Sequence, residues 1–524
     1  MLHILKTHKF VVIIAMIALI INIGLFFIPG DGKNYSYPEM DRAEVKEMVD
    51  HFLDEMNVNG STTFMVESSN ADIRLSKYLE NEVSKEEFET IKGNIPLYTM
   101  AVHVGEARYV HIDPVAKQIV GTNSFAYPIL DGEVETFVQD FFSAEYTLLQ
   151  SERFVPDSLQ LDAGFLSFFT DHTRYTFKGP FELGELQEIV TVEVGTDANG
   201  TMNILGVMQS AEVSSEYMAI DKPGDSLIDI LLQLVIVVLI IGGIGIAALV
   251  HFIVRACQKK VAFWLPLGIT LFLMAFSMVF SYVYMGNLGW LSLIDSLITS
   301  VLVLFILMIT IPNDTVDLQR RPMKQKASLI LDKMKMPIVL GLCFAVIMKP
   351  IADLFFWVGS MFADTWFSPV TFYEIYLVEN IWLLPFFALS IGITAAIMEE
   401  TVFRRYLASV MDKVHPIFAV LVSSFLWAVL HLGYDVFPWY LRIIELTLII
   451  GPFLYWVYKR YGFLTAIYCH YFYNSLLISI GLLYFKVDVA IVAILLTLSP
   501  LLLVLLRKNK TDIGITHEEK QEAI

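Results

Sequence analysis

The sequence predicts a polytopic α-helical membrane protein of about ten transmembrane helices, with an N-terminal extracytoplasmic α+β domain. Hydrophobic residues make up 56% of the 524-residue chain, and its mean hydropathy of +0.60 is too high for an ordinary soluble enzyme. Near-continuous apolar runs of the length that crosses a bilayer recur along the chain. A long acidic segment separates the first run from the others, and there the sequence predicts a folded domain outside the membrane.

Ten apolar runs are long enough to be candidate spans. They cover residues 10–29, 227–254, 261–284, 290–312, 337–359, 381–411, 416–433, 439–457, 463–484 and 487–506. The first run is longer than the apolar part of a usual signal peptide, and no small-x-small cleavage site precedes the polar segment. We therefore interpret residues 10–29 as a retained transmembrane signal anchor.

Basic residues alternate from one junction between spans to the next. Lys6 and Lys9 precede the first run, and every second junction after it is also basic. These junctions hold Arg255, Lys259 and Lys260; Arg320, Arg321, Lys324, Lys326, Lys333 and Lys335; Arg404, Arg405 and Lys413; Lys459 and Arg460; and Arg507, Lys508 and Lys510. Because Lys and Arg concentrate in cytoplasmic loops, the alternation predicts a multi-pass protein of the cell membrane with both termini cytoplasmic. Residues 31–225 are then extracytoplasmic, and residues 507–524 form a cytoplasmic tail.

The exterior segment, residues 31–225, carries the acidic excess of the chain. It holds 35 Asp and Glu against 13 Lys and Arg, a net charge of −22 in a chain whose total is −18. This charge favours solubility and repulsion from anionic surfaces over a specific site for a cation or a basic partner. No nucleic-acid partner is expected, and the partner of the domain is unknown. The three cysteines, Cys257, Cys343 and Cys469, lie in or beside the membrane part, so the exterior domain has no disulfide.

Periodicity predicts helices followed by strands, twice, within the exterior segment. Val45, Met48, Val49 and Phe52 have helical spacing, whereas strict alternation marks the strands. The predicted elements are a helix at 43–58, a hairpin of 98–104 with 109–112, a helix at 134–149, and a hairpin of 190–194 with 202–207 turned at 197–200. This order indicates two α+β halves.

The rest of the chain divides into two membrane segments. Residues 227–335 are expected to hold transmembrane helices and a basic cytoplasmic loop. Within them, residues 314–336 are interpreted as a loop that sets topology, with a surface helix facing anionic headgroups as the alternative. Residues 337–506 hold the remaining runs and all of the motifs described below.

Three groups of polar residues lie inside these last runs. Burying an acidic or imidazole side chain in a membrane costs free energy, so such residues indicate a functional site. They are Glu399-Glu400 with Arg404, then His431, then His470 with Asn474. On a helix, Glu400 and Arg404 at i and i+4 share a face and can pair, whereas Glu399 points about 100° away. His470 and Asn474, also at i and i+4, project from one face toward a common point. Glu400 is thus neutralised by Arg404, and Glu399 remains available as a catalytic group.

This set of side chains suits the hydrolysis of an amide. A carboxylate partly withdrawn from water can act as a general base, provided a neighbour orients the water that it activates. Glu399 with His431 fits that role. The tetrahedral oxyanion needs hydrogen-bond donors where its charge develops, and His470 with Asn474 fits this second role.

Together the motifs resemble those of a known family. Glu-Glu-x-x-x-Arg, an aromatic residue four positions before a His, and His-x-x-x-Asn, each in a separate predicted span, look like the CAAX-protease and bacteriocin-processing (CPBP) family of intramembrane endopeptidases, also called the Abi or Rce1-like family. The resemblance covers roughly residues 337–506. Family members usually have Phe where this chain has Trp427, four residues before His431, and the catalytic positions are unaffected.

The resemblance implies a glutamate-dependent intramembrane endopeptidase, a CPBP core at residues 337–506. The implied roles are Glu399 as base, His431 as a helper in water activation, His470 and Asn474 as oxyanion donors, and Glu400 with Arg404 as a supporting pair. Members have also been described as metalloproteases, so a divalent metal such as zinc is the alternative to a site without a required cofactor. The motif H-E-x-x-H is absent.

The loop charges and the exterior domain are typical of a bacterial protein. We therefore expect a peptide or membrane-protein substrate in the lipid bilayer rather than a prenylated CAAX end. The alternative function is a non-catalytic membrane scaffold or bacteriocin-immunity protein that binds a partner through its exterior domain. A transporter is disfavoured because the sequence shows no duplicated half with interrupted helices in corresponding positions.

Overall fold

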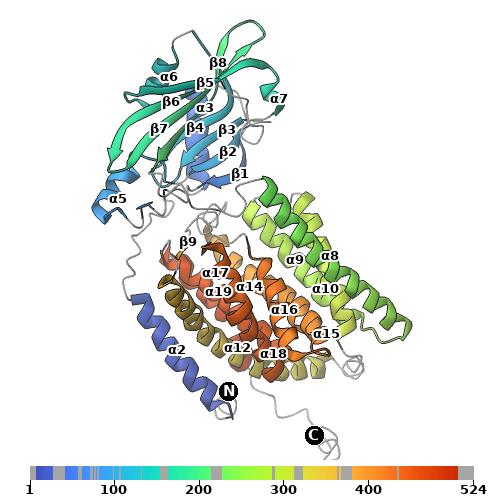
Figure 1. Cartoon of the computed structure of the whole chain (residues 1–524). Helices are drawn as coiled ribbons and strands as arrows, with labels where there is room; N and C mark the ends of the chain where they lie inside the picture. Colours follow the sequence, from blue (N-terminus) through green and yellow to red (C-terminus); the bar gives the residue numbers. More distant parts are fainter. Residues whose placement is uncertain are drawn as a thin grey trace, which may run out of the picture.

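The computed structural model shows an N-terminal β-sheet domain above a bundle of helices (Figure 1). The described residues are 7–27, 40, 42–56, 62–70, 75, 78–79, 82–97, 99–104, 108–130, 133–153, 163–213, 227–285, 290–311, 323–362, 365–367, 381–432, 436–484 and 486–505. The predicted cytoplasmic tail, residues 507–524, lies outside them.

One eight-stranded antiparallel sheet forms the frame of the N-terminal domain. Its strands are β1 (Thr62–Asn70), β2 (Thr99–Val104), β3 (Arg108–Asp113), β4 (Gln118–Ile129), β5 (Thr147–Arg153), β6 (Phe169–Leu183), β7 (Leu186–Asp197) and β8 (Met202–Glu212). Its helices are α3 (Arg42–Glu55), α5 (Lys85–Lys92), α6 (Val134–Phe142) and α7 (Ala163–Leu166). The spatial order β1-β2-β3-β4-β8-β7-β6-β5 makes two halves that join where β4 pairs with β8. Both hairpins predicted from the sequence are present, as β2–β3 and β7–β8.

Helix α3 packs its apolar face against the first half of the sheet. Val45, Val49 and Leu53 are buried in one core with Met100 and Val102 of β2. Their spacing of four residues puts the three side chains on one stripe of the helix. Full burial of an aliphatic side chain of this size contributes about 1.5–3 kcal/mol, so this stripe attaches the helix to the sheet.

The second helix of the domain is shorter than predicted. The sequence indicates a helix over residues 134–149, but α6 ends at Phe142 because Ser143 adopts a left-handed conformation with a φ of 54°. Residues Thr147–Arg153 instead form β5, at the edge of the sheet. Every residue of β5 is exposed, so no alternation of buried and exposed positions marks it as a strand.

His111 of β3 makes the stability of the sheet domain depend on pH. Burial lowers the pKa of this imidazole from 6.5 to about 4, because its charged form is kept from water. Between these values the unfolded chain binds a proton that the folded domain does not, so stability falls as the pH drops, by up to about 3 kcal/mol. We expect His111→Gln to abolish this dependence, measured by thermal denaturation of the full chain at pH 7 and pH 4.5. An equal loss of stability at low pH in both proteins would contradict the assignment.

The helical bundle contains, within the described residues, five helices long and apolar enough to cross a membrane. They are Val238–Cys257, Ile330–Ser360, Ile381–Met411, Trp439–Tyr461 and Phe463–Gly481. Shorter apolar helices lie at Lys9–Leu25, Trp264–Val279, Ser296–Thr310, Pro416–Val429 and Val487–Leu498. Each of these segments overlaps one predicted run. The chain is therefore a multi-pass membrane protein, and the count of ten spans stays a prediction.

The bundle combines long helices with short helical and strand segments. They are α2 (Lys9–Phe27), α8 (Leu227–Cys257), α9 (Trp264–Met285), α10 (Trp290–Thr310), α12 (Met323–Ser360), β9 (Trp366–Phe367), η3 (Ile381–Leu383), α14 (Leu384–Glu399), η4 (Glu400–Ala408), α15 (Ser409–Met411), α16 (Pro416–Val429), β10 (Val436–Phe437), α17 (Trp439–Glu445), η5 (Leu446–Ile450), α18 (Gly451–Tyr461), α19 (Phe463–Gly481), η6 (Leu482–Tyr484), α20 (Val487–Leu498) and α21 (Leu501–Leu505). Helix α12 runs through Pro337 and Pro350, so the predicted boundary at residues 335–337 falls inside one helix. The predicted anchor, α2, packs along α12, where Asn22 Nδ2 donates to the Val346 carbonyl at 3.0 Å.

Helix α19 contacts α12, α14, α18 and α20. Two glycines let its neighbours come close. A Cβ at Gly341 of α12 would meet Tyr468, and one at Gly392 of α14 would meet the Ser475 hydroxyl. Small residues at helix crossings allow such approach in membranes. His470 lies between Tyr468 and Ser475, so the two crossings fix the segment that carries it.

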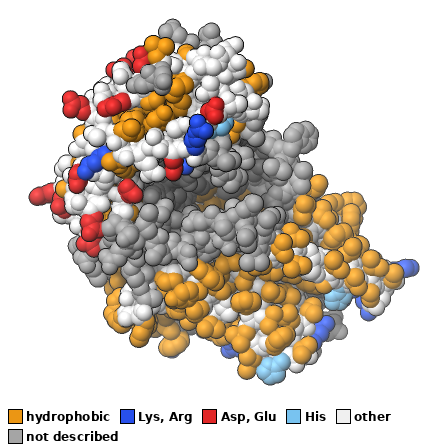
Figure 2. Space-filling model, turned by 45° about the horizontal axis from the view of Figure 1, so that its top comes forward, with side chains coloured by type: hydrophobic (Ala, Val, Ile, Leu, Met, Phe, Trp, Pro, Cys, Tyr) orange, Lys and Arg blue, Asp and Glu red, His pale blue; other side chains and the backbone are white. Residues whose placement is uncertain are grey.

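The surface of the bundle differs from that of the sheet domain. Acidic side chains lie on the domain, whereas hydrophobic side chains cover the bundle and Lys, Arg and His appear at its far end (Figure 2). The predicted orientation requires this distribution. In a Cys-free background, we expect Ser151→Cys to react with an impermeant thiol reagent in intact cells, and Val414→Cys to react only after permeabilisation. Both positions are exposed, and reaction of both from outside would contradict the predicted topology.

Candidate active site

The two adjacent glutamates lie at a change of helix type. Helix α14 ends at Glu399, and η4, which begins at Glu400, is a π-helix that continues to Ala408. π-Helical turns are rare in proteins, but those that do occur are frequently found at functional sites. Nothing in the apolar and polar pattern of residues 381–411 distinguishes this segment from an ordinary α-helix.

Glu400 is fully buried and is held by two partners. The distance from its Oε1 to Arg404 Nη1 is 3.4 Å, and the two side chains are 0% and 1% exposed. His470 of α19 places Nδ1 2.9 Å from the same oxygen, as a donor to the carboxylate. The Arg404 guanidinium also lies over the Trp427 ring, with its carbon 4.1 Å from the ring centroid. The expected pairing of Glu400 with Arg404 is present, and it also positions His470.

Glu399 differs from its neighbour because its side chain is 23% exposed. The indole N–H of Trp427, in α16, donates to Oε2 over 2.5 Å. His470 Nε2 lies 3.6 Å from that oxygen, so one imidazole faces both glutamates. The second oxygen, Oε1, makes no hydrogen bond to a described residue and is not among the buried polar atoms that lack a partner. It is therefore the carboxylate oxygen that a water can reach.

His431 lies one turn beyond Trp427, just after α16. Its Nδ1 is 2.9 Å from the Trp427 carbonyl oxygen. Because a carbonyl only accepts, Nδ1 carries the proton and Nε2 is the acceptor of the neutral ring. The two rings meet edge to face with centroids 5.0 Å apart. Trp427 thus holds Glu399 through its indole and His431 through its carbonyl, so it links the two residues that the sequence assigns to water activation.

His470 and Asn474 share one face of α19 but differ in their surroundings. His470 is 4% exposed and lies between the two carboxylates. Asn474 is half-buried, and the structure gives its side chain no hydrogen bond to the described residues. The structure thus brings Glu399, Glu400, Arg404 and His470 together, places His431 against Trp427, and leaves Asn474 without a direct link to them.

Trp427 is the site residue that reasoning from the sequence missed. It was interpreted only as a variant of the Phe usual in the family. Its position four residues before His431 puts both side chains on one helix face, which was the available signal. The bundle also holds two further ion pairs, Lys349 with Asp353 at 2.5 Å, both partly exposed, and Arg442 with the buried Glu445 at 2.5 Å.

Whether this site needs a metal was left as an alternative by the sequence, and a site without a required metal stays a prediction. Among the described residues, no three His, Cys, Asp or Glu side chains are grouped closely enough to hold a metal ion. No step in the mechanism below passes through a metal.

The segment that contains the candidate site is similar to a known protein family. Residues 381–476 match the family model described as type II CAAX prenyl endopeptidase Rce1-like. This segment resembles the Rce1-like family. The match confirms the resemblance for about a fifth of the chain, and it includes every catalytic and supporting residue predicted from the sequence.

Part of the chain is also similar to a bacterial protein. The sporulation-killing factor biosynthesis protein SkfC of Bacillus subtilis (strain 168) is 33% identical over 104 residues, which is 19% of this chain and 20% of SkfC. The chain therefore aligns with about a fifth of that protein's length. No solved structure matches the chain significantly. The Rce1-like segment runs from η3 into α19, so one contiguous part of the chain supplies the whole cluster.

Proposed function

We propose that the chain is an intramembrane endopeptidase that hydrolyses peptide bonds of a membrane-associated protein or peptide with a water activated by Glu399. The observation that carries the proposal is the difference in burial between the two adjacent glutamates. Glu400 is sealed at 0% exposure between Arg404 and His470, whereas Glu399 is 23% exposed with one oxygen open. A general base needs this combination of a fixed carboxylate and access to water.

The proposed reaction begins with a water bound at Glu399 Oε1. Glu399 accepts a proton from it, and the oxygen attacks the scissile carbonyl carbon to form a tetrahedral oxyanion. Collapse of this intermediate breaks the C–N bond, and the proton held by Glu399 passes to the departing amine. His431, with Nε2 as its acceptor nitrogen, helps to orient the water. Trp427 fixes both side chains, so their relative position does not have to be acquired during the reaction.

His470 and Asn474 are the proposed oxyanion donors. Nδ1 of His470 donates to Glu400, and Nε2 is the nitrogen on the Glu399 side, so donation to the oxyanion from Nε2 requires the doubly protonated ring. Glu400 with Arg404 thus acts through His470 by fixing the orientation of its ring. Asn474 lies one turn further along α19 on the same face, and its amide would contribute a second donor. No metal is required by this scheme.

Asn474 provides a test that separates catalysis from a scaffold role. We expect Asn474→Ala to lower kcat by about 10²-fold with little change in KM, because donation to an oxyanion strengthens in the transition state. Asn474→Asp should be impaired most at high pH and partly recover at low pH, where the new carboxyl is protonated. The measurement is kcat and KM of the purified chain across pH, with and without chelator.

The alternatives predict different results. A non-catalytic scaffold or immunity protein has no turnover for Asn474→Ala to change. A metal-ligand role predicts that Asn474→Asp works at neutral pH and that chelation inactivates the wild type. A loss confined to KM would reject the oxyanion role.

A further inference from the structure

A second polar site lies at the end of the bundle away from the sheet domain. It is a cavity of about 570 Å³ where five helices end or begin. The contributing elements are the C-terminal ends of α8, α10 and α18, the segment from η4 into α15 and beyond, and the start of α19. None of the glutamates and histidines of the candidate active site lines it.

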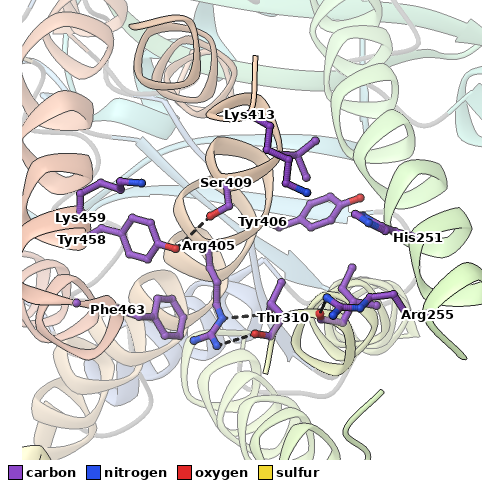
Figure 3. Close-up of a pocket in the computed structure, with 13 residues that line it drawn as sticks. His251, Arg255, Thr310, Arg405, Tyr406, Ser409, Lys413, Tyr458, Lys459 and Phe463 are labelled. Carbon is purple, nitrogen blue, oxygen red and sulfur yellow. Dashed lines mark hydrogen bonds between the residues drawn. The ribbon is translucent and has the colours of Figure 1, made fainter. Parts of the chain in front are cut away.

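The lining of this cavity is strongly basic. Four cationic side chains line it, Arg255, Arg405, Lys413 and Lys459, and no acidic residue does. Figure 3 shows Arg405 and Arg255 near Thr310 on one side of the cavity, with the two lysines across from them. Asp412 lies beside the cavity and neutralises Lys459 at 2.7 Å. The other three cations form no ion pair with an acidic residue in the part of the chain that the structure describes, so positive charge is concentrated around one space.

The two arginines are held by backbone carbonyls and keep donors to spare. Arg255 Nη1 donates to the Ile309 carbonyl at 2.8 Å. Arg405 donates from Nε to the Thr310 hydroxyl at 3.0 Å and from Nη2 to its carbonyl at 2.9 Å. An arginine has five N–H donors, and no nitrogen of either side chain is buried without a partner. Their remaining N–H groups therefore face open space.

The Arg405 guanidinium is also fixed in orientation. Its carbon lies 4.4 Å from the centroid of the Phe463 ring, so the planar group is stacked as well as hydrogen-bonded. Nearby, the hydroxyls of Ser409 and Tyr458 are 3.1 Å apart. A rigid guanidinium with lysines and hydroxyls around it is the donor set that suits a phosphate group, because the fork matches two phosphate oxygens.

We propose that this cavity binds a phosphate-bearing anion. The source that its surroundings favour is the headgroup of an anionic lipid, since basic pockets between transmembrane helices on one side of the membrane bind such groups. Exposed apolar side chains accompany the lining: Val410 lines the cavity itself, and Val250 and Val254 of α8 precede the lining residues His251 and Arg255, with exposures of 38%, 56% and 48%. They provide a surface for acyl chains beside a polar pocket.

The position of the cavity gives the ligand a structural role. Helices α8, α9 and α10 form a unit that packs against the Rce1-like segment through α9 with α14 and α10 with η4. The cavity lies at this junction, with His251 and Arg255 from the unit and Arg405 and Ser409 from the segment. A bound phosphate would connect the two and raise the melting temperature. Since Arg404 and Arg405 are neighbours in η4, the same turn lines the cavity and contacts Glu400.

The test uses the detergent-solubilised full chain and soluble probes. Binding and melting temperature are measured with dihexanoyl-phosphatidylglycerol, with zwitterionic dihexanoyl-phosphatidylcholine, and with inorganic phosphate. We expect phosphatidylglycerol to bind and to stabilise the protein, and phosphatidylcholine to do neither. Lys413→Gln should weaken binding about fivefold, the usual contribution of one basic residue. Arg405→Gln should weaken it further.

Arg460 provides the matched control because it is exposed at the same end of α18 but does not line the cavity. Arg460→Gln removes the same charge and should leave binding unchanged. Equal weakening in Arg460→Gln and Lys413→Gln would overturn the proposal, because it would indicate attraction to the surface as a whole. Binding of phosphatidylglycerol alone identifies a lipid headgroup, and equal binding of inorganic phosphate identifies a free phosphate site. Binding of neither probe overturns the proposal even if Arg405→Gln fails to fold, since it is measured on the wild type.

Discussion

Replacing Glu399 with Gln is expected to lower the rate of peptide-bond hydrolysis by about 10²–10⁴-fold, the usual contribution of a general base. The amide has nearly the shape of the carboxylate and can still accept the Trp427 indole N–H, so the site should keep its geometry. It cannot take a proton from water. The measurement is kcat/KM of the purified chain, with the melting temperature recorded on the same preparation.

The Glu399→Gln variant is informative because it should change the rate without changing the stability. Glu399 is 23% exposed and contributes no ion pair as close as that of Glu400, so we expect a melting temperature within the range of the wild type. A rate near that of the wild type would remove Glu399 from the mechanism. A large fall in the melting temperature would show instead that Glu399 is structural.

Arg404→Ala is expected to have the largest effect on stability, about 3–5 kcal/mol, which is typical when one partner of a buried pair is removed. Glu400 would then be left at 0% exposure with His470 as its remaining close partner. The stacking of the guanidinium on Trp427 at 4.1 Å would also be lost. The measurement is thermal or chemical denaturation in detergent.

Arg460→Ala is the control for this second prediction, because Arg460 is exposed near the end of α18. It removes the same charge and a side chain of the same size from a hydrated position, where little change is expected. If Arg404→Ala melts at the same temperature as the wild type, the pair with Glu400 is hydrated rather than buried.

Much of the architecture was predictable because its signals are local. Apolar runs of bilayer length identify the helices of the bundle, and strict alternation identified β2–β3 and β7–β8. The predictions failed where the pattern of apolar residues carries no signal. The helix over residues 134–149 stops at Ser143 through a single left-handed residue, and β5 has no buried face to reveal it.

In the candidate site, too, some contacts follow from local spacing in the sequence and others do not. The pairing of Glu400 with Arg404 follows from a spacing of four residues, and the structure contains it. The π-helix of η4 does not follow from the sequence pattern. The bond from Trp427 to Glu399 depends on how α16 packs against the end of α14, which no spacing within one helix specifies. For the same reason, no spacing indicated that Trp427 holds both Glu399 and His431.

The most direct test of the proposed function compares membranes from cells that produce the wild type, Glu399→Gln or Glu185→Gln, the last a matched change at an exposed turn of the sheet domain. New N-termini in membrane proteins and peptides are measured in each. The proposal predicts cleavage products that are present with the wild type and with Glu185→Gln and absent with Glu399→Gln at equal protein levels. An identical set of products in all three would contradict hydrolysis by a water that Glu399 activates.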